Sequence, residues 1–226
     1  MSTLQARDLR KVYGQGDSRV EALRGVSLEL AGGEFLAVVG PSGCGKTTLL
    51  QLCGGMDRAT FGTVTVDGVA LGNLDDERLT RLRRERVGFV FQFFNLLPTL
   101  TLAENIALPL LLAGVPPAEG ATRAREGAER VGLAHRLAHF PAQVSGGELQ
   151  RAAVARAVIH TPSLVIADEP TGNLDTDSGQ RVLDVLRTLH QETGVAVLLA
   201  THDDVIAGAA DRVLRMVDGV EVPATR

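Results

Sequence analysis

Apolar and polar residues are arranged along this 226-residue chain in patterns that separate strands from helices. Two segments near the start, Leu4–Leu9 and Val20–Leu30, alternate as strands with one buried face do. Continuous apolar runs, which are typical of strands buried on both faces, follow at 35–39, 88–91, 164–167 and 195–199. Because helical patterns lie between these runs, the sequence predicts an α/β fold with a mostly parallel core sheet and antiparallel N-terminal strands.

Two Asp-Gly pairs mark further strands. Residues 62–68 read as a strand that ends in such a turn, and a second pair separates 213–217 from 220–222, which predicts a closing hairpin. Charged amphipathic patterns predict helices at Asp75–Arg86 and from Asp175 to about His190.

The pattern becomes mainly helical between residues 93 and 157, with helices expected at Thr101–Ala113, Pro117–Val131 and Leu149–His160. In the last of these, Arg156 falls on the apolar face, so we expect it to have a partner there. We interpret the whole chain, 1–226, as one domain. Its core would comprise 1–92 and 158–226, and a helical subdomain at about 93–157 would be inserted between them.

A glycine-rich stretch joins the run 35–39 to the start of a helix. Its glycines let backbone N–H groups approach an anion, and the helix N-terminus behind them carries partial positive charge. Lys46 adds a charge for β- and γ-phosphates, and Thr47 offers a hydroxyl to Mg²⁺. The alternative, a turn with this spacing by chance, is disfavoured by the flanking strand and helix. The phosphate-binding candidates are Gly40, Pro41, Ser42, Gly43, Cys44, Gly45, Lys46, Thr47 and Thr48.

Two carboxylates, Asp168 and Glu169, end the buried run 164–167. Carboxylates in that position are costly unless they serve a cation or a proton transfer. Asp168 suits Mg²⁺, and Glu169 can hold or deprotonate an attacking water. A pair of helix N-cap residues is the alternative.

Three other features each admit two interpretations from the residues alone. Tyr13, the only tyrosine, is a chance surface residue or a stacking platform for a base, and its loop position favours the former. Ser145-Gly146-Gly147-Glu148 is a helix cap or a second anion cradle, with the cap favoured. The apolar segment 93–98 is core of the insertion or a docking patch, with neither favoured.

Most of the polar candidates directly follow buried strands. Ligands of parallel α/β sheets bind at the carboxyl ends of the strands, so these groups should meet at one edge. A phosphate cradle, a metal carboxylate, a candidate base and two neutral polar groups together predict a nucleotide-hydrolysis site. The groups at this edge are the loop 40–47, Gln92, Asp168, Glu169 and His202.

Composition and charge limit the classes of partner that we expect for this chain. The net charge is −4 and no basic stripe is present, which argues against nucleic acid. The two cysteines lack metal-site spacing, and no apolar run approaches the ~20 residues of a membrane helix. We therefore expect a cytoplasmic protein whose membrane role, if any, comes through another protein.

An ordered set of motifs resembles those of the ATP-binding cassette (ABC) ATPases over almost the whole chain. The set comprises Tyr13, the phosphate loop 40–48, Gln92, Ser145-Gly146-Gly147-Glu148, Leu164–Glu169, Asn173-Leu174-Asp175 and His202. The resemblance implies ATP as ligand and Mg²⁺ as cofactor.

The resemblance also implies roles for single residues. Tyr13 would stack on adenine, which replaces the surface interpretation. Gln92 would contact Mg²⁺ and the attacking water. Glu169 would be the catalytic carboxylate, and His202 would touch the γ-phosphate.

A second copy of the chain is implied as well. Ser145-Gly146-Gly147-Glu148 would act in trans on ATP held by that copy, which replaces the cap interpretation. The result would be a head-to-tail dimer enclosing two ATP molecules, with Asp175 near its seam.

Narrower similarities, in 54–57, 91–98 and 168–175, are to the lipoprotein-release, macrolide-export and cell-division branch. They imply an ATPase subunit of an export-type transporter, attached to the inner face of the membrane through a permease. The permease would dock near Phe93, Phe94, Leu96 and Leu97. A regulatory module of the cell-division type that transports nothing is the alternative. DNA-associated ABC ATPases are disfavoured because the insertion is short and the chain is not basic.

Overall fold

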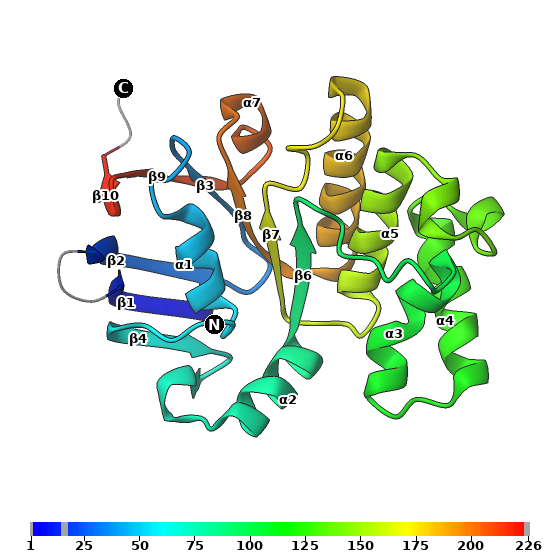
Figure 1. The fold of residues 1–226 in the computed structure, drawn as a ribbon, viewed down its shortest axis with the longest axis horizontal. Helices are drawn as coiled ribbons and strands as arrows, with labels where there is room; N and C mark the ends of the chain where they lie inside the picture. The colour runs from blue at the N-terminus through cyan, green and yellow to red at the C-terminus, as the bar shows by residue number, and fades with distance from the viewer. Residues whose placement is uncertain (1, 15–17, 224–226) are drawn as a thin grey trace.

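The computed structural model describes residues 2–14 and 18–223, in which two sheets and seven α-helices are arranged along one long axis (Figure 1). Each neighbouring pair of strands in the first sheet is antiparallel. In spatial order, this sheet consists of β2 (Val20–Ala31), β1 (Ser2–Tyr13), β4 (Phe61–Val66) and β5 (Val69–Ala70).

The second sheet is mostly parallel, as predicted, and only its last pair, β10 with β9, is antiparallel. Its spatial order is β10 (Val220–Val222), β9 (Arg212–Val217), β3 (Phe35–Val39), β8 (Ala196–Thr201), β7 (Leu164–Asp168) and β6 (Val87–Phe91).

Helices α3, α4 and α5 lie together at one end of the molecule, and the antiparallel sheet lies at the other (Figure 1). The helices are α1 (Lys46–Cys53), α2 (Asp76–Arg86), α3 (Leu102–Leu112), α4 (Pro117–Arg130), α5 (Gly146–Val158), α6 (Thr176–Thr193) and α7 (Asp204–Ala207). Single 3₁₀ turns lie at Leu71–Asn73, Ala134–Arg136 and Pro141–Gln143.

The central strands β3, β7 and β8 are apolar over nearly all of their length because the pleat sends alternate residues into different cores. In β8, Ala196, Leu198 and Ala200 join the core shared with the antiparallel sheet, α1 and α2. Val197 and Leu199 point the other way, into the core shared with α3 to α6. The helical end of the molecule therefore packs on one face of the central sheet through a continuous core.

Among the differences from the sequence prediction, two concern element boundaries near the site and one concerns a helix that was missed. Tyr13 was expected in a loop, but it is the last residue of β1 and pairs with Val20. Helix α5 begins at Gly146, three residues before the predicted start, because Ser145 caps it. Helix α7 was not predicted, since a four-residue helix has too short a periodicity to detect.

Gly88 in β6 allows α5 to approach the sheet. A Cβ there would lie 2.0 Å from the carbonyl oxygen of Ala157. We expect Gly88→Ala to lower the free energy of unfolding, measured with denaturant, by about 1–3 kcal/mol or more, because α5 must move away from the sheet. At Gly72 a Cβ would meet nothing within 4 Å, so Gly72→Ala should change stability by less than about 0.5 kcal/mol. Equal effects of the two substitutions would show that this close approach does not limit stability.

Candidate functional site

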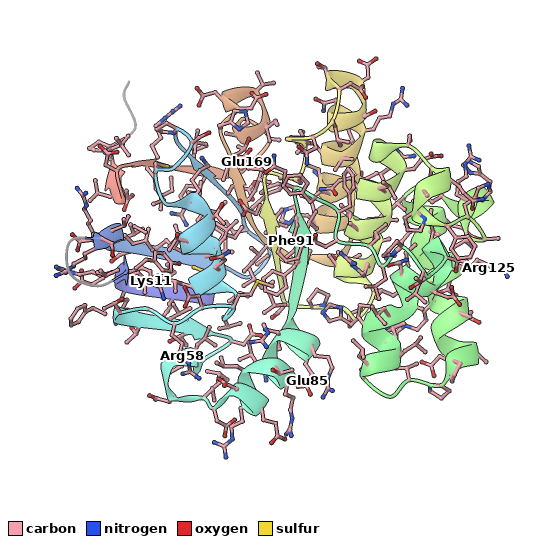
Figure 2. All side chains as sticks on the ribbon, in the orientation of Figure 1. Lys11, Arg58, Glu85, Phe91, Arg125 and Glu169 are labelled. Atoms are coloured by element: carbon pink, nitrogen blue, oxygen red, sulfur yellow. The ribbon has the colours of Figure 1, made fainter. Side chains whose placement is uncertain are left out.

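Parallel pairing around β8 brings the polar candidates to one edge of the sheet. In the register of these strands, Val39 is opposite Thr201 and Asp168 is opposite Ala200. The residues that follow the strands therefore emerge side by side, and Glu169 lies at the ends of the central strands (Figure 2). Gln92 joins them because Phe91, at the end of β6, is opposite Asp168.

The predicted phosphate loop turns sharply into α1 at Gly45. Its φ of 104° is in the region that favours glycine, and a Cβ would lie 2.5 Å from the Ala22 carbonyl oxygen. Beside the loop is a cavity of about 340 Å³ that brings together most of the predicted site. Its lining consists of Ala22, Ser42, Gly43, Gly45, Lys46, Thr47, Thr48, Gln92, Glu169 and His202.

The Lys46 side chain is buried and held in place from two sides. Its ammonium donates to the carbonyl oxygens of Gly40 at 2.7 Å and of Pro41 at 3.1 Å. It also lies 3.6 Å from Oε1 of Glu169. The lysine therefore presents a fixed positive charge between the phosphate loop and the end of β7.

Thr47 and Asp168 place two oxygens next to each other, since Thr47 Oγ1 donates to Asp168 Oδ1 at 3.2 Å. Burial, the largest cause, raises the pKa of Asp168, and the charge of Glu169 adds to the effect. A cation at these oxygens would relieve both costs. Magnesium is commonly held by one or two protein oxygens together with phosphate and water, so this pair fits Mg²⁺. Within the described residues, no cluster of three or more His, Cys, Asp or Glu could hold a metal by itself.

Glu169 occupies a backbone conformation that a side chain of its kind seldom adopts, with a φ of 47°. Such a residue costs about 1–3 kcal/mol and is held by its surroundings, here by hydrogen bonds of its N–H to Ala200 and of its carbonyl to Gly172. Oε2 of its carboxylate lies 2.8 Å from Nδ1 of His202. An ionised carboxylate can only accept, so this contact places the proton on Nδ1.

Asn173, to which the sequence analysis assigned no separate role, orients Gln92. Nε2 of Gln92 donates to Asn173 Oδ1 at 3.3 Å, and Asn173 Nδ2 donates to the Gln92 carbonyl at 3.0 Å. Gln150, which sequence reasoning missed, is fully buried and donates to the carbonyls of Phe91 and Pro170. The sequence feature that could have revealed Gln150 is its position as a single amide on the apolar face of α5. Gln150 ties the strand end before Gln92 to the turn after Glu169.

Tyr13 is not among the residues that line the cavity beside the phosphate loop. The residue is 39% exposed, and its hydroxyl donates to Asp57 at 2.9 Å. The Thr48 side chain, which lines the cavity, is close enough to lower the pKa of this hydroxyl, although burial and Asp57 raise it overall.

Ser145-Gly146-Gly147-Glu148 forms a capping box at the start of α5. Ser145 Oγ accepts from the Glu148 N–H, and the Glu148 carboxylate accepts from the Ser145 N–H at 2.8 Å. The cap that the residues themselves favoured is therefore present. None of these four residues lines the phosphate-loop cavity of the same chain. Asp175 likewise caps α6, by accepting from the Ser178 N–H at 2.9 Å.

The expected docking segment is only partly exposed. Phe93 is 71% exposed and Leu97 is 45% exposed, whereas Phe94 and Leu96 are half-buried. Arg156 has the partners expected for it, since its guanidinium donates to the carbonyls of Phe94 and Asn95. Helix α5 thus holds the backbone between Gln92 and Leu97.

The sequence profile of a family described as ABC transporter matches residues 23–172. The chain belongs to this family. The lipoprotein-releasing system ATP-binding protein LolD of Geobacter metallireducens is 47% identical over 96% of the chain and 97% of its own length. An uncharacterized ABC transporter ATP-binding protein of Thermotoga maritima is also 47% identical, over 94% of the chain and 90% of its own length.

Solved structures of ABC cassettes share the fold. A dimeric post-hydrolysis state of the cassette MJ0796, bound to ADP and Pi, superposes with a TM-score of 0.89 at 37% identity, covering 97% of both chains. Another dimeric structure of MJ0796, described as a bacterial ABC transporter cassette, has the same TM-score at 38% identity. In the part of this cassette that the structure describes, no helix is long and apolar enough to cross a membrane.

The capping box predicts a pH dependence of stability. Hydrogen bonds from the Ser145 backbone, and then from its side chain and Arg136, lower the pKa of Glu148 from 4.5 to about 2 despite the opposing effect of burial. The stabilisation is therefore complete above about pH 4.5 and is lost as the pH falls toward about 2. We expect the difference in unfolding free energy between the unmodified chain and Glu148→Gln to shrink over this range, as measured by denaturant titrations. A difference that does not depend on pH would contradict the capping role of the ionised carboxylate.

Proposed function

We propose that this cassette hydrolyses ATP, with Mg²⁺ as cofactor, and so powers a membrane transporter. The observation that carries the proposal is the Glu169 carboxylate, which borders the phosphate-loop cavity between Lys46 and His202. A base beside a phosphate cradle is what water-driven phosphoryl transfer requires.

The position of each residue around the cavity indicates its role in ATP hydrolysis. Backbone N–H groups of the loop 40–48 and the Lys46 ammonium would bind the phosphates. Thr47 and Asp168, with Gln92, would hold Mg²⁺, which supplies charge neutralisation at the phosphate oxygens. Donation from His202 Nδ1 to Glu169 orients the ring. With both ring nitrogens protonated, Nε2 would donate to the terminal phosphate. Glu169 would accept the proton of the attacking water.

Tyr13 would support the adenine base. Its exposed ring lies beside Thr48 at the rim of the same loop. Aromatic rings stack on any flat base, so this contact would add affinity without choosing between bases.

A second copy would complete each site. Gly146 and Gly147 open α5, and the first amides of a helix have no partner within it, so they suit an anion brought from outside. The dimeric state of the structural neighbours supports this arrangement. In such a dimer, Asp175 would lie near the seam.

The transporter would be of the export or extraction type, and the LolD relatives favour lipoprotein release as its task. The chain would lie on the inner face of the cell membrane, attached through a permease. The docking site would include Phe93 and Leu97 and the neighbouring cavity of about 500 Å³, whose apolar lining includes Phe89, Leu108 and Leu112. The half-buried side chains of Phe94 and Leu96 would hold segment 93–97 against the rest of the cassette.

The test of the proposed activity is Glu169→Gln, which keeps the size and polarity of the side chain but removes the base. We expect ATP binding, measured by calorimetry, to persist, and hydrolysis, measured as phosphate release, to fall by about 10²-fold or more. Glu119→Gln on the exposed face of α4 is the matched control and should hydrolyse normally. Hydrolysis at a normal rate by Glu169→Gln would remove Glu169 from the role of base.

A further inference from the structure

A charged pair lies directly behind Tyr13. Asp57 accepts from the Tyr13 hydroxyl through Oδ2 at 2.9 Å and from the Lys11 ammonium through Oδ1 at 2.7 Å. Lys11 and Tyr13 are two residues apart on β1, so their side chains leave the same face of the strand. The Lys11 ammonium also lies over the Tyr13 ring, 4.8 Å from its centroid.

The loop that carries Asp57 is fixed at both ends. Next to α1, the Asp57 N–H donates to the Gln51 carbonyl at 3.3 Å. Next to β1, the Thr60 N–H donates to the Arg10 carbonyl at 2.9 Å, and the Val12 N–H donates to Thr60 Oγ1 at 3.1 Å. Asp57 thus spans the helix that begins at the phosphate loop and the strand that ends at Tyr13.

The protonation states of Asp57 and Tyr13 favour a stable hydrogen bond between them. Burial opposes ionisation of Asp57, but hydrogen bonds from Lys11, the Arg58 N–H and Tyr13 outweigh it and lower the pKa of this carboxyl. Burial and the bond to Asp57 raise the pKa of Tyr13. Around neutral pH, therefore, an ionised acceptor holds a protonated phenol, and charge-assisted bonds of this kind are the stronger ones.

We propose that Asp57, anchored by Lys11, is a positioning residue that fixes the Tyr13 ring as the platform for the base of a bound nucleotide. The inference rests on the proposed role of Tyr13 in stacking. Lys11 covers one face of the ring, so a base can stack only on the other face. The residue would act on affinity for the base and leave the phosphates unaffected.

The test compares ADP with inorganic pyrophosphate, which has the phosphates but no base, using calorimetry on the full chain with Mg²⁺. We expect Asp57→Ala to weaken ADP binding by about three- to tenfold, the value of an oriented aromatic contact, with pyrophosphate binding unchanged. Tyr13→Phe loses the same hydrogen bond and should weaken ADP to the same extent. Because both act through that bond, adding Asp57→Ala to Tyr13→Phe should cause no further loss.

A spectroscopic readout follows Tyr13 alone, because the chain has one tyrosine and no tryptophan. ADP should change the tyrosine emission and pyrophosphate should not. In Asp57→Ala the midpoint of the ADP titration should shift by the same factor as the calorimetric dissociation constant. Asp57→Asn, which keeps an oxygen for the hydroxyl, should bind ADP more tightly than Asp57→Ala.

Asp76→Ala is the matched control, since Asp76 pairs with Arg58 in the same region but is almost fully exposed and does not contact Tyr13. It should bind both ligands normally. Equal loss of ADP and pyrophosphate binding in Asp57→Ala, or a further loss in the double variant, would overturn the inference. Tyr13→Ala separates the two roles. If it weakens ADP binding but not pyrophosphate binding, and Asp57→Ala weakens neither, then Tyr13 stacks on the base but Asp57 does not position it. If Tyr13→Ala binds both ligands normally, then Tyr13 does not stack on the base, and the positioning role of Asp57 is rejected as well.

Discussion

The register of the parallel strands around β8 is the constraint on which the site depends. β3 and β7 both pair with β8, so the phosphate loop, Glu169 and His202 emerge at the same level of the sheet. A slip of one residue would exchange the two faces of a strand and bury its polar end. In β8 each face packs into a different core, so a slip of this strand would disrupt the packing of both cores. Packing far from the cavity therefore fixes the chemistry inside it.

Charge is arranged at that edge before any ligand arrives. Two backbone carbonyls orient Lys46, and Lys46 and His202 flank the Glu169 carboxylate. Preorganised charge of this kind is effective because little reorganisation is needed during the reaction. The left-handed backbone at Glu169 is one cost of the arrangement, and its hydrogen bonds to Ala200 and Gly172 maintain it.

Much of this could be predicted from the sequence, because strands buried on both faces and the phosphate loop have strong local signals. The pairing of Gln92 with Asn173 and of Tyr13 with Asp57 had none, since these contacts join residues that are distant in the chain. Tyr13 was misplaced in a loop because the end of β1 is polar and only pairing with Val20 makes it a strand. Ser145 illustrates the reverse case: its cap was readable from local residues, whereas a role toward a second copy depends on surfaces that no local pattern describes.

The central claim is that each chain supplies half of a hydrolytic site. It is tested by mixing two variants, Lys46→Ala, which damages the phosphate loop, and Ser145→Asp, which keeps an N-cap residue but places a carboxylate against the partner's phosphates. Each variant alone should hydrolyse ATP poorly. A mixed dimer contains one intact pair of halves, so the account predicts that phosphate release from the mixture exceeds the sum of the two variants measured separately. A mixture that shows only that sum would contradict the account and would place a complete site within one chain.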